Sequence, residues 1–181
     1  FACTLFLFIT SISIFNVFAE ENDDFVAMVG SVKYENYAEA WDAVKNGGTV
    51  TMLKDWHIAE VLTVNENKTV TVNMNGFMIN RGLTDDERSG EVFLVKNGAV
   101  LNIVGEANSA VEHKGTIQGD MWHYNIGGKH VIKGALITGG YNSNGGGAIH
   151  IQKNAQVKIE NVTIAGNAST DGSGAGAIRL D

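Results

Sequence analysis

The feature that most constrains the fold of this chain is a glycine-rich repeat near its C-terminal end. The sequence Gly-Gly-Ala-Ile-His-Ile at residues 146–151 returns as Ala-Gly-Ala-Ile-Arg-Leu at residues 175–180, an offset of 29 residues. Self-similarity with a period of about 20–50 residues is typical of proteins built from stacked units, in which each unit buries its apolar face against its neighbours. The chain is therefore expected to stack short repeated units on one another.

Two further matches extend the repeat upstream. Residues 131–140 match residues 158–167 at an offset of 27, and residues 92–97 match residues 149–154 at an offset of 57, close to twice the unit. Strands joined by loops of variable length produce such a drift in the offset, whereas helices would lose their 3.6-residue phase. The repeat therefore favours strands over helices.

Each unit has the pattern of short β-strands. Apolar and polar residues alternate through residues 70–79 and 157–164, and the alternation ends at Gly and Asn turn residues. We predict an all-β fold, a parallel β-solenoid whose coils occupy residues 48–181 and continue after Asp181. Its inward, nearly fully buried residues should be Val70, Val72, Val157, Ile159, Ile164 and Ile178, with Thr71, Lys158 and Arg179 facing water.

Polar residues of the repeat are expected to join neighbouring coils. Lys133 and Glu160 share a repeat position, which predicts an exposed ion pair between coils. Asn67, Asn161 and Asn167 begin Asn-x-Ser/Thr sequences, which carry glycans in a eukaryotic secretory pathway. The simpler interpretation of Asn161 and Asn167 is that they are turn residues whose side-chain amides stack between coils.

Residues 1–19 are almost wholly apolar and end at Val-Phe-Ala, just before the acidic residues 20–24. An apolar run followed by small residues at the cleavage positions predicts a secretory signal peptide. The alternative is a membrane anchor, which needs about 20 apolar residues, and the four polar side chains within positions 10–16 weaken it. We favour a signal peptide, and hence a secreted or cell-surface protein without a transmembrane segment after cleavage.

Residues 20–47 are expected to form an N-terminal hairpin, turning at Gly30, and one helix. Asn36 is placed to cap the helix, Glu39 stands in capping-box position, and Gly47 should end it. The helix carries one apolar stripe, and this stripe has two interpretations: an aromatic platform for a ligand, or a cap that shields the first strand edges. We favour the cap. The stripe consists of Tyr37, Ala40, Trp41 and Val44.

Two stretches carry a family resemblance. Residues 48–55 (Gly-Thr-Val-Thr-Met-Leu-Lys-Asp) and 68–76 (Lys-Thr-Val-Thr-Val-Asn-Met-Asn-Gly) resemble the right-handed parallel β-helix domain, with a pectate-lyase-like fold, of many secreted bacterial surface proteins. The helix segment at residues 34–40 is similar to the segment that opens such domains. The resemblance covers about residues 26–181 and implies a right-handed parallel β-helix with an N-terminal amphipathic capping helix.

The C-terminal repeats are also similar to a second group of surface proteins. Residues 146–149 (Gly-Gly-Ala-Ile) and 164–167 (Ile-Ala-Gly-Asn) resemble the Gly-Gly-Ala-Ile and Phe-x-x-Asn repeats of polymorphic outer-membrane adhesins, with Ile164 in place of Phe. These resemblances imply a fold more than an activity, because the β-helix architecture carries lyases, glycosidases and adhesins alike.

Charge and spacing exclude several kinds of site. The formal net charge of −7 argues against a nucleic-acid partner, which needs clustered Lys and Arg. The acids Asp120, Glu160, Asp171 and Asp181 share no repeat position, so no pair of catalytic carboxylates is predicted. The five histidines, at positions 57, 113, 123, 130 and 150, lack the spacing of metal ligands. We therefore predict no catalytic residue, metal or cofactor in this segment.

The segment that departs most from the repeat, residues 120–124, is the candidate binding site. Its candidate ligand-binding residues are Asp120, Trp122, His123 and Tyr124, which could hold a sugar by ring stacking and hydrogen bonds. The alternative is a loop whose aromatic rings pack onto the side of the solenoid.

These observations predict a secreted or cell-surface module for binding or structure, similar to an adhesin. Its partner would be a polysaccharide or a host or cell-surface glycan. The alternative is a carbohydrate-active enzyme, a polysaccharide lyase or a glycoside hydrolase, with catalytic residues after residue 181.

Overall fold

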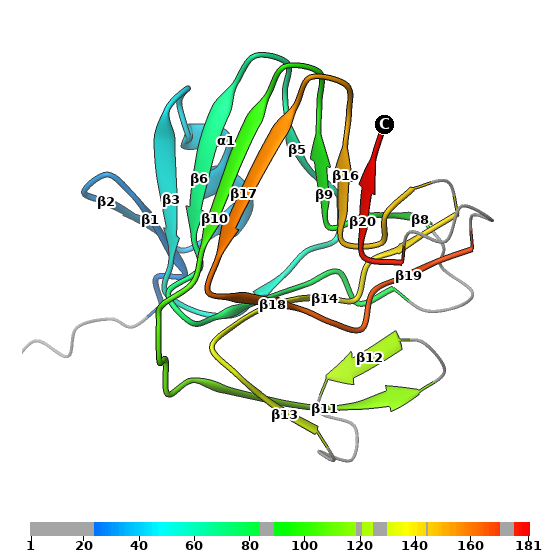
Figure 1. Cartoon of the computed structure of the whole chain (residues 1–181). Coiled ribbons are helices and arrows are strands. Elements are labelled where there is room, and N and C mark those ends of the chain that lie inside the picture. Colours follow the sequence, from blue (N-terminus) through cyan, green and yellow to red (C-terminus); the bar gives the residue numbers. More distant parts are fainter. Residues whose placement is uncertain (1–23, 84–88, 119–120, 125–129, 144, 171–175) are drawn as a thin grey trace, which may run out of the picture.

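The structure is a computed structural model of the 181-residue chain and describes residues 24–83, 89–118, 121–124, 130–143, 145–170 and 176–181. Within these residues the chain forms twenty short β-strands and one helix, α1 (Figure 1). The strands belong to five separate sheets. Apolar side chains from three of these sheets form the main core, which includes Val50, Ile79 and Phe93.

Four strands of the six-stranded sheet run parallel and in register. They are β3 (Gly48–Met52), β6 (Thr69–Asn73), β10 (Val100–Val104) and β17 (Gln156–Glu160), which lie side by side in that order (Figure 1). Val50 lies beside Val72, Val72 beside Ile103, and Ile103 beside Ile159. Because side chains alternate between the two faces of a strand, this register keeps one apolar row on the core side.

The other two parallel sheets have four strands each, also in chain order. One contains β4 (Trp56–His57), β7 (Met78–Asn80), β14 (Ala135–Thr138) and β18 (Val162–Ile164). The other contains β5 (Leu62–Val64), β9 (Phe93–Val95), β16 (Ile149–Ile151) and β20 (Ile178–Leu180). Ile149 pairs with Ile178, as the 29-residue repeat predicts. Phe93 rather than Val92 pairs with Ile149, so the predicted offset of 57 is one residue too long there.

Antiparallel pairing occurs in three of the five sheets. β1 (Ala27–Val29) joins the edge of β3 and pairs with β2 (Val32–Tyr34). β11 (Glu112–Gln118) pairs with β12 (Met121–Tyr124) and β13 (His130–Lys133). In the remaining sheet, β15 (Tyr141–Asn142) is antiparallel to β8 (Ser89–Gly90) and parallel to β19 (Ala168–Ser169).

The prediction of a right-handed parallel β-helix over residues 48–181 is wrong. That fold would pair its strands in parallel throughout, whereas the described residues form five short sheets, three of which contain antiparallel pairs. The repeat correctly indicates several neighbouring strands, but it does not extend through the segment between β10 and β14. There the chain turns back on itself, and β11, β12 and β13 satisfy backbone hydrogen bonds with one another.

The predicted core rows are confirmed in part. Val70 and Val72 are buried, with 1% and 0% of their surface exposed, and Thr71 between them is only half-buried. Nearly complete burial was wrong for four other residues, because β17, β18 and β20 are edge strands of their sheets and no described strand covers their outer side. Lys158 is exposed and Arg179 half-buried, while Val157, Ile159 and Ile164 are half-buried and Ile178 is 42% exposed.

The N-terminal hairpin and helix form where the sequence predicts them. α1 spans Tyr37–Ala43, and the Asn36 side chain caps it by accepting a hydrogen bond from the Ala38 N–H at 2.7 Å. The helix ends before Gly47, whose positive φ of 78° instead serves the turn into β3. The edge of β3 is paired with β1, so the hairpin rather than the helix shields that edge.

The predicted ion pair between Lys133 and Glu160 does not form. Lys133 lies directly across from Glu112 in the antiparallel sheet, and their side chains pair at 3.2 Å. Glu160 instead pairs with Lys158 of its own strand at 2.8 Å. The repeat alignment was misleading here because β13 leaves the stack of parallel strands.

Asparagine side chains link neighbouring layers of the chain. The Asn167 amide donates to the Ile137 carbonyl and its oxygen accepts from the Gly140 N–H, both at 3.0 Å. This confirms that the Asn167 amide bridges successive layers. Asn161 has a positive φ of 54°, a backbone conformation that Asn tolerates better than most residues, so its interpretation as a turn residue is also confirmed.

A buried histidine connects the antiparallel sheet to the parallel ones. His113 of β11 is 1% exposed; its Nδ1 lies 3.7 Å from the Asp55 carboxylate and its Nε2 lies 3.0 Å from the Gly76 carbonyl. Both nitrogens therefore face acceptors, which suits the imidazolium form. Burial alone would lower the pKa of His113, but Asp55 and Gly76 raise it above its ordinary value. Burial would raise the pKa of Asp55, but His113 and the Met78 N–H lower it.

The contribution of this pair to stability should depend on pH in both directions. Because the pKa of His113 is raised and that of Asp55 is lowered, the full contribution of the pair to stability is present between about pH 4 and 6.5. It should decline as the pH rises through the pKa of folded His113, and also as the pH falls through that of folded Asp55. His113→Gln should lower the free energy of unfolding by about 1.5–3 kcal/mol near pH 6, and by less at alkaline pH. Urea denaturation of both proteins across pH would test this, and a pH-independent difference would contradict it.

Removal of the N-terminal hairpin and helix should promote self-association. Deleting residues 25–46 leaves β3 as an unpaired edge that can accept a strand from a second molecule. Sedimentation analysis should detect oligomers of the shortened protein at concentrations where the full chain is monomeric. A shortened protein that remains monomeric would show that the hairpin does not protect this edge.

Candidate functional site

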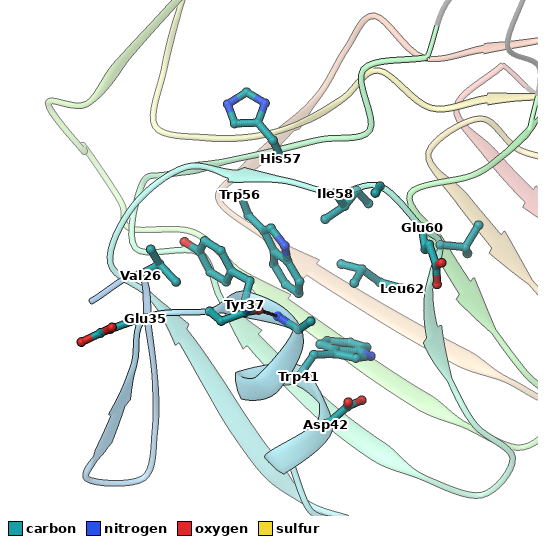
Figure 2. A pocket seen from close by; sticks show the side chains of 14 residues that line it. Val26, Glu35, Tyr37, Trp41, Asp42, Trp56, His57, Ile58, Glu60 and Leu62 are labelled. Carbon is teal, nitrogen blue, oxygen red and sulfur yellow. Dashed lines mark hydrogen bonds between the residues drawn. The ribbon is translucent and has the colours of Figure 1, made fainter. Parts of the chain in front are cut away.

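A cavity of about 690 Å³ lies where α1 meets the chain between β4 and β5 (Figure 2). Tyr37 and Trp41 reach it from α1, Trp56 comes from β4, and Ile58 and Leu62 line the other side. Ligand pockets commonly measure about 300–1,000 Å³ and combine apolar walls with a few polar groups. The cavity is therefore the candidate functional site.

Aromatic rings form one wall of the cavity and hold one another in place. Tyr37 stacks on Trp56 with ring centroids 4.5 Å apart and planes 8° apart. Trp41 lies tilted against Trp56 at 6.0 Å and against Phe93 at 6.4 Å. Tyr37 and Trp56 are buried, whereas Trp41 is half-buried. Among these rings Trp41 therefore offers the most surface to a ligand.

The Tyr37 hydroxyl anchors α1 to the chain segment that precedes β4. It donates a hydrogen bond to the Lys54 carbonyl, just before β4. Burial raises the pKa of Tyr37 well above its ordinary value, so the phenol stays protonated in neutral solution. Because this proton is already donated, Tyr37 contributes a rigid ring rather than a free donor.

Carboxylates surround the aromatic wall. Glu35 follows β2, Asp42 lies in α1 next to Trp41, and Glu60 lies between β4 and β5. Figure 2 shows Glu35 and Glu60 on opposite sides of the cavity, with Asp42 beyond Trp41. All three side chains belong to exposed residues, so they can accept hydrogen bonds from a bound molecule.

The residues predicted as a binding site lie elsewhere. Asp120 is outside the described residues. Trp122, His123 and Tyr124 lie in β12, where their backbones pair with Ile117, Thr116 and Gly115 of β11. Their side chains are outside the described part of the structure, so their binding role stays a prediction. Figure 1 shows β12 well separated from α1, so this segment does not contribute to the cavity.

Sequence reasoning found the helix stripe but missed its partners. Tyr37 and Trp41 were recognised as aromatic residues on one face of a helix and interpreted as a cap. Trp56 and Glu60 were not connected with them, because they lie in a separate segment that has no periodic pattern. The available sequence signal was Trp56 itself, a tryptophan between Asp55 and His57. In the structure it lies in the two-residue strand β4.

A buried carboxylate was also missed. Glu91 lies between β8 and β9, is 7% exposed, and accepts a hydrogen bond from the Asn142 side chain. Buried acids are uncommon unless they are paired, so this residue is held by a specific contact. The repeat pattern gives no indication of it.

Neither the described structure nor the comparison with known proteins narrows the function of the chain further. In the ranges that the structure covers, no three His, Cys, Asp or Glu side chains are grouped to hold a metal ion. The same ranges contain no helix with the length and apolar character of a membrane span. Comparisons with models of protein families, with curated proteins and with solved structures gave no match, so they assign the chain to no family.

The aromatic wall predicts distinct effects for two substitutions of Tyr37. Tyr37→Phe removes the hydrogen bond to Lys54 but keeps the stacked ring, and should lower the free energy of unfolding by about 0.5–1.5 kcal/mol. Tyr37→Ala also removes the ring from Trp56, and should cost about 3–5 kcal/mol. Urea denaturation measures both. Equal losses in the two variants would mean that the stacked ring contributes little.

Proposed function

We propose that the protein is a binding module that takes up a carbohydrate in the cavity beside α1. The observation that carries this proposal is the half-buried Trp41 ring, held by Trp56 and Phe93 and bordered by the Asp42 carboxylate. Sugars present an apolar C–H face and a rim of hydroxyl groups. An aromatic ring next to hydrogen-bond acceptors matches both.

The rigidity of the site also favours binding. Trp41 packs in a tilted arrangement against two rings, and α1 is fixed by the Asn36 cap and the Tyr37 hydroxyl. A ring that is already ordered loses little conformational freedom when a ligand stacks on it. The cavity can therefore accept a ligand without a rearrangement of its aromatic wall.

A binding role fits the cavity better than the chemistry of a polysaccharide lyase. A lyase on a uronate needs a strong base, usually Arg or Lys, beside a cation site. The cavity lining contains neither Lys nor Arg. We therefore propose binding rather than lyase chemistry at this position.

We also propose that the protein acts outside the cell, as a secreted or cell-surface glycan receptor. This part rests on the apolar residues 1–19, whose sequence suits a signal peptide. A glycan-binding cavity is most useful where polysaccharides are exposed, so location and ligand class support each other.

Substitution of Trp41 should weaken glycan binding. Trp41→Ala should lower the affinity for oligosaccharides selected on a glycan array about tenfold, which corresponds to about 1.4 kcal/mol of stacking energy. Trp41→Phe, which keeps an aromatic ring, should retain most of the affinity. Isothermal titration calorimetry measures both variants, and circular dichroism checks that they are folded.

Trp122→Ala is the matched comparison, because residues 120–124 are the competing candidate. It should leave the affinity unchanged if the cavity beside α1 is the site. Loss of binding in Trp122→Ala but not in Trp41→Ala would move the site to β12.

A further inference from the structure

The charge of the cavity limits which sugar it can hold. Glu35, Asp42 and Glu60 belong to its lining and come from three different segments of the chain, with the Glu35 carboxylate pointing away from the aromatic rings (Figure 2). None of its 14 lining residues is Lys or Arg, and His57 is the one lining residue with a basic side chain. The cavity thus combines aromatic walls with an excess of negative charge.

Within the described residues no side chain forms an ion pair with these three carboxylates. The Arg81 guanidinium lies near Glu60, however, and donates to the carbonyls of Ile58 and Ala59. The three carboxylates keep their negative field at the opening, where it attracts cations and repels anions. A uronate sugar would bring a like charge to this field.

The lining also offers more hydrogen-bond acceptors than donors. The three carboxylates supply more acceptor sites than the lining has donors, which are chiefly the Asn36 amide and the two indole N–H groups, and the Tyr37 hydroxyl already donates to Lys54. A ligand that satisfies the site must bring more donors than acceptors. An ammonium group brings three donors and a positive charge.

We infer that the preferred ligand is a sugar that bears a protonated amine, such as a glucosamine unit without its acetyl group. This inference rests on the proposed function of the cavity. The sugar ring stacks on Trp41, and its ammonium group lies against Asp42 or Glu60. Cations near an indole face gain a further attraction from the ring.

Three oligosaccharides of equal length test this inference, with titration calorimetry of the full chain in a buffer acidic enough to protonate the amine. They are a glucosamine oligomer, an N-acetylglucosamine oligomer and a galacturonate oligomer, which carry positive, no and negative charge. The glucosamine oligomer should bind about tenfold more tightly than the acetylated one, and the galacturonate oligomer should not bind. The preference should shrink between about 0.02 and 0.2 M NaCl, as screening requires.

Isosteric variants show whether the cavity itself causes the preference. Asp42→Asn and Glu60→Gln should each reduce the affinity for the glucosamine oligomer about two- to fivefold while leaving that for the acetylated oligomer nearly unchanged. Glu66→Gln is the control, because Glu66 is an exposed acid outside the cavity. Equal losses in Glu66→Gln would mean that the net charge of −7 attracts the ligand without a site, and would overturn the inference.

The remaining outcomes separate this inference from the proposed function. Equal affinities for the amine and acetylated oligomers, both weakened by Trp41→Ala, would overturn the amine preference and leave a glycan-binding cavity. Absence of binding by any oligosaccharide would overturn both. An oligolysine peptide that binds as tightly as the glucosamine oligomer would show that the cavity recognises charge rather than an amino sugar.

Discussion

The register between parallel strands is the constraint on which the rest of this structure depends. Val50, Val72, Ile103 and Ile159 form one continuous row because each strand pairs with the next without a shift. A slip by one residue would turn every member of the row to the opposite face. In the other two parallel sheets the same in-register pairing places Trp56 and Leu62 at the end of the core rows.

At that end, the packing of the core and the shape of the cavity have a common origin. The rows of core side chains finish at Trp56 of β4 and Leu62 of β5, and Tyr37 and Trp41 of α1 pack against Trp56. Closing an apolar core with broad, flat rings leaves some ring surface at the boundary with solvent. The acids beside this boundary lie on connecting segments, where an exposed charge carries little desolvation cost.

The sequence predicted the local structure well where one pattern repeats. The alternation around Val70 and Val72 placed the core side of β6 correctly, and Asn36 marked the start of the helix. The overall fold was not predictable from the repeat, because β12 and β13 both pair antiparallel with β11, although residues 131–133 of β13 match the repeat. The periodic pattern records which face of a strand is apolar, but strand direction depends on loops that carry no such pattern.

The candidate site was predictable only in pieces. Tyr37 and Trp41 share a helix face and can be grouped from their spacing alone. Trp56 joins them through tertiary packing, about which neither segment carries a periodic signal. The distinction between a packing residue and a binding residue depends on how much ring surface remains accessible, and that is a property of the folded chain.

The position of the edge strands has a consequence for the order in which the molecule opens. Among the strands that the structure describes, β17, β18 and β20 each have a neighbour on one side only, as do β4 and β5, whereas β6 and β10 are hydrogen-bonded on both sides. Backbone amides should therefore exchange with solvent first in these edge strands and last in β6 and β10. The cavity is formed with β4 and β5, at the opposite ends of the sheets from β18 and β20. Local fraying of β17, β18 and β20 would leave the aromatic wall intact, whereas β4 carries Trp56 and is held at its own edge by the stacking of Tyr37 from α1.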